Sequence, residues 1–271
     1  MRKLLLFCAF SFCLFSGLES AVVVGSIQNT SGIKDISVVN NALSWRERAM
    51  LWAVENKHST LVTLLLKVGA DVNMQDKDGF TALMHAALSR RDEIVRLLLT
   101  AGADVNIQNK AGDTVLMTAA LYGDPALIQL LFAAGADVDI QDEDGNTALM
   151  WVAEYGSVKD KISGLLLKAG ADVNKQNNYG RTALMFAAEH GGEDIGLLLK
   201  AGADVNVQNK HGWTALTYAA FSRKNVDVCL LLKAGANVHI RDKDGVTALE
   251  HAQARKDNDA VVCLLRAAGA K

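Results

Sequence analysis

The stretch that decides the fold is residues 109–141, NKAGDTVLMTAALYGDPALIQLLFAAGADVDIQ. Its beginning is typical of a turn, because Gly112 can take the positive φ that a tight turn requires. Thr114 then precedes a run in which Leu116 and the alanines after it recur at helical spacing. The first half of the stretch therefore predicts a turn followed by a helix.

The second half of the same stretch predicts a second helix. Asp124 is a residue type that caps helices, and Pro125, the one proline of the chain, follows it where a helix tolerates proline. A stripe of leucine and isoleucine comes next, and Gly135 is placed to end the helix in a left-handed conformation. Residues 109–141 thus form one unit of a turn and two helices.

This unit recurs along most of the chain. Gly-Ala-Asp or a close variant returns at intervals of 33, 33, 35, 32, 33 and 34 residues, at Gly69, Gly102, Gly135, Gly170, Gly202, Gly235 and Gly269. A second motif, threonine followed by Ala-Leu or Val-Leu, keeps step with the first at Thr81, Thr114, Thr147, Thr182, Thr214 and Thr247. Two motifs locked in phase indicate internal repeats.

Both motifs and their period resemble the ankyrin repeat, a turn plus two antiparallel helices. The resemblance covers residues 45–271 and implies an all-α ankyrin-repeat solenoid of helix-turn-helix units joined by turns or β-hairpin loops. The first unit lacks part of the repeat pattern, and the last unit becomes polar after its threonine motif. Both features are typical of the end caps of a repeat stack. The expected units are 45–75, 76–108, 109–141, 142–176, 177–208, 209–241 and 242–271.

The chain departs from the family pattern in several places. Methionine stands where the family has histidine, at Met84, Met117, Met150 and Met185. Such a row could bind a soft metal, but one methionine per repeat at a fixed phase predicts core packing. Length changes near residues 158–161 and 191–192 are expected to fall between helices.

The N-terminal residues predict export. Arg2 and Lys3 precede the apolar run 4–15 and then small residues, the order of a secretory signal. We expect a signal peptide over 1–20 and a linker over 21–44, with a bacterial periplasm as the favoured compartment and secretion as the alternative. A buried N-terminal helix or an uncleaved anchor remains a competing interpretation, although the apolar run is shorter than a membrane-spanning helix needs.

Composition and motifs argue against catalysis and nucleic-acid binding. The net charge of -2 provides no basic field for a polyanion. The phosphate-loop, nucleophile-elbow and zinc-ligand patterns are absent from the sequence. We therefore expect no catalytic residues, no metal, no cofactor and no membrane contact beyond the signal.

Five aspartates occupy the same position in their repeats, which predicts a turn-capping role: Asp71, Asp104, Asp137, Asp172 and Asp204.

Cys229 and Cys263 also share one repeat phase. Equivalent positions on neighbouring helices lie about 8 to 10 Å apart, which exceeds the span of a disulfide. We expect two free thiols.

The resemblance implies that the turn tips and the ends of the first helices form a concave surface that binds other proteins. Aromatic and apolar side chains gather at these positions, and we expect partner contacts at Phe80, Leu88, Leu121, Tyr122, Tyr155, Tyr179, His211, Trp213 and Phe221. The competing interpretation is that Phe80 and Trp213 shield their own turns and that the tyrosines pack on neighbouring repeats.

Two functions follow from this surface. The first is an exported, non-enzymatic protein-interaction module whose partner lies in the groove. The alternative is a structural spacer or anchor in the cell envelope with no groove ligand. For the first, we expect Tyr155, Tyr179, Trp213 and Phe221 to form one continuous stripe, and we expect truncation of Trp213 or Phe221 to weaken binding with little effect on stability.

Overall fold

A computed structural model describes residues 45–155, 160–191, 194–255 and 258–271. In these ranges 14 helices follow one another as seven pairs. The pairs are α2 (Trp45–Glu55) and α3 (Ser59–Lys67), α4 (Ala82–Leu88) and α5 (Asp92–Thr100), α6 (Val115–Tyr122) and α7 (Pro125–Ala133), α8 (Ala148–Glu154) and α9 (Asp160–Lys168), α10 (Ala183–His190) and α11 (Asp194–Lys200), α12 (Ala215–Phe221) and α13 (Asn225–Lys233), and α14 (Ala248–Gln253) and α15 (Asp259–Ala267).

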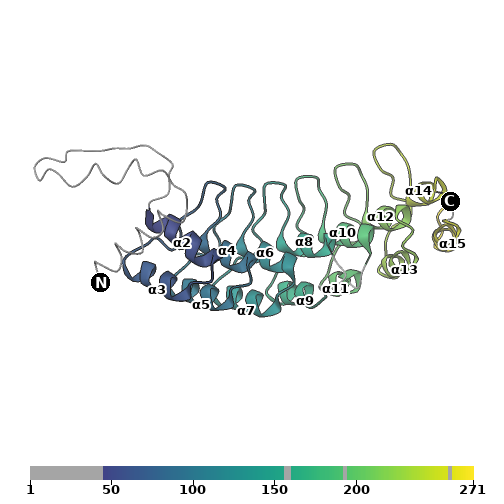
Figure 1. Cartoon of the computed structure of the whole chain (residues 1–271). Helices are drawn as coiled ribbons and strands as arrows, with labels where there is room; N and C mark the ends of the chain where they lie inside the picture. Colours follow the sequence, from purple (N-terminus) through teal and green to yellow (C-terminus); the bar gives the residue numbers. More distant parts are fainter. Residues whose placement is uncertain (1–44, 156–159, 192–193, 256–257) are drawn as a thin grey trace, which may run out of the picture.

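The helix pairs stack side by side into an elongated, two-layered solenoid (Figure 1). The first helices, α2 to α14 by even number, form one layer, and the second helices form the other. The connecting loops all project to the same side of the first layer. The predicted all-α solenoid of helix-turn-helix units is confirmed.

Several sequence predictions fall outside the described residues. The signal peptide, the linker and the cleavage site lie in 1–44, and the length changes lie at or beside 156–159 and 192–193. Within the described ranges, none of the helices combines the length and the apolarity needed to cross a membrane.

Threonine caps set where the first helices begin. Thr114 has an extended backbone, and its side chain accepts a hydrogen bond from the N–H of Met117. Thr81, Thr147, Thr214 and Thr247 act in the same way. At α7, Asp124 accepts hydrogen bonds from the N–H groups of Ala126 and Leu127, and Pro125 lies in the first turn as predicted.

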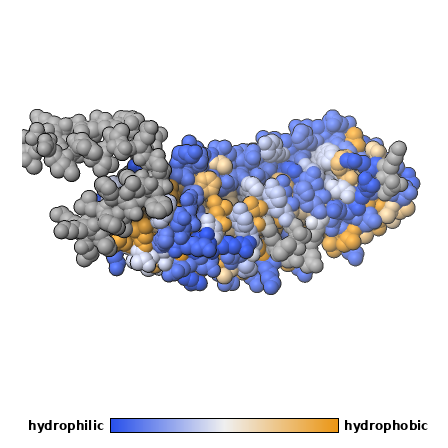
Figure 2. All heavy atoms as spheres, viewed as in Figure 1, coloured by the Kyte–Doolittle hydropathy of each residue, from blue (hydrophilic) through white to orange (hydrophobic). Residues whose placement is uncertain are grey.

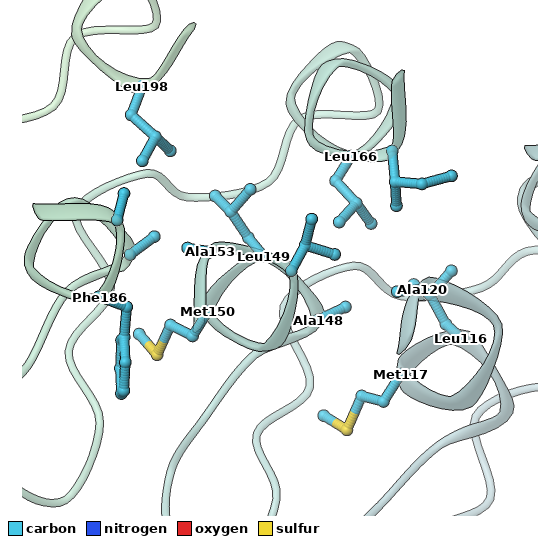
Figure 3. Packing of buried hydrophobic residues seen from close by; sticks show 14 of the residues in the cluster. Leu116, Met117, Ala120, Ala148, Leu149, Met150, Ala153, Leu166, Phe186 and Leu198 are labelled. Carbon is cyan, nitrogen blue, oxygen red and sulfur yellow. The ribbon is translucent and has the colours of Figure 1, made fainter. Parts of the chain in front are cut away.

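The four methionines are core residues, as predicted. Met84, Met117, Met150 and Met185 are all buried. In Figure 3, Met117 extends from α6 toward α8, and Met150 extends from α8 toward Phe186 of α10. Buried leucines fill the space between the layers, and small alanines let the first helices approach closely. One hydrophobic core therefore runs through the whole stack.

Hydrogen bonds join each loop to the next and hold the loops as one surface. A backbone N–H near each loop tip donates to a carbonyl of the preceding loop at 2.9 or 3.0 Å, in the pairs Lys110 to Asp78, Glu143 to Ala111, Asn178 to Asp144, Lys210 to Tyr179 and Lys243 to His211. Glutamine side chains add a second row, since Gln108 Nε2 donates to the carbonyls of Gly112 and Gln141 at 2.7 and 2.8 Å. The loop tips are thus held in fixed positions relative to one another.

The repeat-phase aspartates cap turns, which confirms their predicted role. Each accepts a hydrogen bond from the backbone N–H two residues later, as Asp104 does from Asn106 at 2.8 Å. The same bond forms at Asp71, Asp137, Asp172 and Asp204. These local hydrogen bonds explain why an aspartate recurs at this position of the repeat.

Both cysteines in the described part of the chain are free. Cys229 on α13 is half-buried, and Cys263 on α15 is exposed. This agrees with the expectation from their shared repeat phase.

Candidate functional site

A hollow of about 440 Å³ lies where three consecutive loops meet α8, α10 and α12. We call it the central hollow. Its lining combines aromatic rings with polar and charged side chains: Asp144, Asn146, Trp151, Glu154, Tyr155, Asn177, Tyr179, Arg181, Phe186, Asn209, His211 and Tyr218. Figure 2 shows hydrophilic residues over most of the visible surface, with patches of apolar residues between them.

Loop and helix are tied together at the walls of the central hollow. Trp151 Nε1 on α8 donates to Asp142 Oδ2 at 2.8 Å. Asn209 Nδ2 donates to the Tyr218 hydroxyl on α12 at 2.9 Å. Both bonds join residues nine apart, a loop residue and a helix residue of one repeat. They fix the aromatic rings relative to the loops.

The same nine-residue connection occurs in the second and the last repeat. His85 Nε2 lies 2.9 Å from Asp76 Oδ2, and His251 Nε2 lies 2.6 Å from Asp242 Oδ2. Burial would raise the pKa of each aspartate, but the hydrogen bonds from the histidine and from backbone N–H groups outweigh it, so both pKa values lie below the usual value. Both aspartates are therefore charged at neutral pH.

Arg181 forms the charged part of one wall. Its guanidinium lies over the Phe186 ring at 3.9 Å and over the Tyr218 ring at 4.6 Å from the ring centroids. It also donates a hydrogen bond to the Glu189 carboxylate on α10. Burial is the main cause that raises the pKa of the Tyr218 hydroxyl, although Arg181 lowers it. The wall therefore holds a guanidinium between aromatic rings and a carboxylate.

Two tyrosines present their rings to solvent beside this wall. Tyr155 and Tyr179 are 52% and 53% exposed. The Tyr155 ring stacks on Trp151 with centroids 5.6 Å apart. The Tyr179 hydroxyl donates to Asp144 Oδ1 of the preceding loop at 3.2 Å, and the charge of Asp144 raises the pKa of that tyrosine. Both rings are held in place while much of their surface stays open.

Trp213 and Phe221 form a separate ring cluster. Trp213 lies 5.3 Å from Phe221, 5.1 Å from Tyr218 and 4.7 Å from His251 between ring centroids. The Arg255 guanidinium lies over Phe221 at 3.6 Å. Tyr218 belongs both to this cluster and to the lining of the central hollow, so it links two groups of rings that the sequence predicted as one stripe.

The burial of Trp213 bears on one expectation. Trp213 is half-buried and packs against the core, as Phe80 does. Truncating Trp213 would remove contacts within the stack, so the structure predicts a loss of stability, whereas the repeat phase alone predicts little change. For these two residues, the interpretation that the ring shields its own turn fits the structure better.

The other residues expected to contact a partner fall into two sets. Tyr155, Tyr179 and His211 come together at the central hollow. Leu88 and Leu121 are half-buried at the end regions of α4 and α6. Tyr122 is 46% exposed, and its carbonyl accepts a hydrogen bond from Arg90 at 3.3 Å. Phe80, Leu88, Leu121 and Tyr122 do not line the central hollow.

Sequence reasoning did not select three aromatic residues of the lining, Trp151, Phe186 and Tyr218. All three lie four residues after the repeat threonine. Aromatic side chains at this phase in three consecutive units were the signal that could have found them.

Among the described residues, no three or more histidine, cysteine, aspartate or glutamate side chains are grouped closely enough to hold a metal ion.

The family comparison agrees with this architecture. A family model described as ankyrin repeats (3 copies) matches residues 18–109, 116–209 and 195–271. These ranges include all the residues that line the central hollow. No curated protein matches the chain.

Proposed function

This chain belongs to the ankyrin repeat family, and from that premise we propose that it is a non-enzymatic module that binds a protein partner through the concave face of its repeat stack. Ankyrin repeats generally mediate protein–protein interaction. The observation that carries the proposal is the half exposure of Tyr155 and Tyr179 beside a hollow of about 440 Å³. Tyrosine, tryptophan and arginine dominate the binding energy of protein interfaces.

The surface around the central hollow is structurally ordered, and this supports the same function. Backbone and glutamine hydrogen bonds connect the loops, and Asp142 and Asn209 hold the rings of Trp151 and Tyr218. A surface that is already ordered loses little conformational entropy on binding. The side chains around the central hollow are therefore suited to anchor a partner segment.

Photo-crosslinking from defined positions tests this function. With a photoreactive phenylalanine analogue at Tyr179, in cells that make the protein, we expect one crosslinked partner, identified by mass spectrometry. The matched control carries the analogue at Gln129, an exposed residue of α7 in the other helix layer, and should not crosslink that partner. Crosslinks from Gln129 alone, or none from Tyr179, would favour the alternative of a spacer or anchor with an empty groove.

We also propose that the module acts outside the cytoplasm, with residues 1–20 as a signal peptide and 21–44 as a linker. Arg2, Lys3 and the apolar run 4–15 support this. A bacterial periplasm is the proposed compartment, with secretion as the alternative. The intact mass of protein purified from its native cells should match a chain that begins near residue 21. A mass that retains residues 1–20 in a cytosolic fraction would overturn export.

A further inference from the structure

We propose that the central hollow binds one lysine or arginine side chain of the protein partner. In this arrangement the carboxylates of Asp144 and Glu154 face the cation, and the rings of Tyr155 and Tyr179 flank it. The inference deepens the groove function proposed above and rests on it.

The charges of the central hollow favour a cation. Two carboxylates, Asp144 and Glu154, belong to its lining. Asp144 accepts a hydrogen bond from the neutral Tyr179 hydroxyl, and the ion pairs found among the described residues include neither carboxylate. The one arginine of the lining, Arg181, is paired with Glu189. Within the described part of the chain, therefore, neither of these two negative charges of the lining takes part in an ion pair.

The aromatic composition of the lining favours the same ligand. Five of its residues carry aromatic rings other than imidazole: Trp151, Tyr155, Tyr179, Phe186 and Tyr218. The face of an aromatic ring attracts a cation electrostatically. Arg181 over Phe186 and Tyr218 is an example within this wall. Tyr155 and Tyr179, each about half exposed, add further ring surface to the same lining that a second cation can contact.

Size and charge together favour a single basic side chain over other occupants. A volume of about 440 Å³ accommodates a long side chain with part of its backbone but not a folded domain. An anionic side chain would be repelled by Asp144 and Glu154. A purely apolar side chain would desolvate these carboxylates without replacing their lost hydration. A flexible basic side chain satisfies both the rings and the carboxylates.

A titration with small probes tests the proposal on the full chain. Nα-acetyl-arginine amide and Nα-acetyl-lysine amide are added while the indole N–H of Trp151 and the ring signals of Tyr155 and Tyr179 are followed by NMR. We expect saturable shifts at these signals with at least one of the two cations, and weaker binding at high salt. Nα-acetyl-norleucine amide, the uncharged counterpart of lysine, should bind at least fivefold more weakly.

Charge-neutralising variants locate the effect. The double variant Asp144→Asn/Glu154→Gln should weaken binding of the cation at least fivefold. Glu143→Gln is the matched control, because Glu143 is an exposed carboxylate of the same loop that does not line the central hollow. Equal binding of the norleucine probe, no saturable shift with either cation, or an unchanged affinity in the double variant would overturn the proposal. A partner that still crosslinks at Tyr179 would then leave the groove function standing.

Discussion

Gly112→Ala is expected to lower the free energy of unfolding by about 3 kcal/mol. Gly112 has a φ of 80°, where an L side chain is strained. A methyl group there would also meet the backbone of the next repeat, 2.6 Å from the nitrogen of Glu143 and 2.7 Å from the Cα of Asp142. The loop-to-loop hydrogen bond between Glu143 N–H and the carbonyl of Ala111 lies at this contact. The substitution would therefore separate two stacked loops.

Gly245→Ala is the matched control, because it separates the strain from the collision. Gly245 occupies the same loop position in the last repeat and has a φ of 76°. A methyl group on Gly245 would have no atom from elsewhere in the described ranges within 4 Å. Only the conformational penalty remains there, about 1 kcal/mol. Urea unfolding of both variants, followed by circular dichroism, measures the difference. Equal losses of unfolding free energy in the two variants would show that the stacked loops move apart with little loss of stability.

The fold could be predicted because it depends on residues that recur. Each glycine two residues before the repeat threonine has a positive φ, and the helix expected after Thr114 begins there, with the Thr114 side chain capping it. Thr182 is an exception, since it begins α10 without a side-chain cap bond. Burial of Met117 and its equivalents follows from the phase of the first helix alone. Such positions meet the same neighbours in every unit, so one unit represents all of them.

The site was harder to predict because it depends on what differs between units. Trp151 and Phe186 occupy one repeat phase, but Trp151 donates to Asp142 while Phe186 lies beneath Arg181. Phase alone also placed Trp213 on the surface, whereas the rings of Tyr218 and His251 pack against it. Contacts between unlike side chains of adjacent units decide which rings stay open. A repeat pattern carries no information on these contacts.

The double variant Tyr155→Ala/Tyr179→Ala is expected to weaken partner binding at least tenfold, with a nearly unchanged melting temperature. Interface aromatics often contribute about 2 kcal/mol or more, while substitutions at exposed positions usually change stability by about 0.5 kcal/mol or less. Binding is measured by titration of the partner identified through crosslinking at Tyr179.

Two single variants give the contrast that this prediction needs. Tyr122→Ala removes a ring of similar exposure, 46%, from outside the central hollow, and should weaken binding less than the double variant does. Trp213→Ala should instead lower stability by about 2 kcal/mol, because Trp213 packs against the core and three neighbouring rings. If the double variant lost stability and its folded fraction kept full affinity, Tyr155 and Tyr179 would belong to the stack. The open rings of the central hollow would then not be the anchors of a partner.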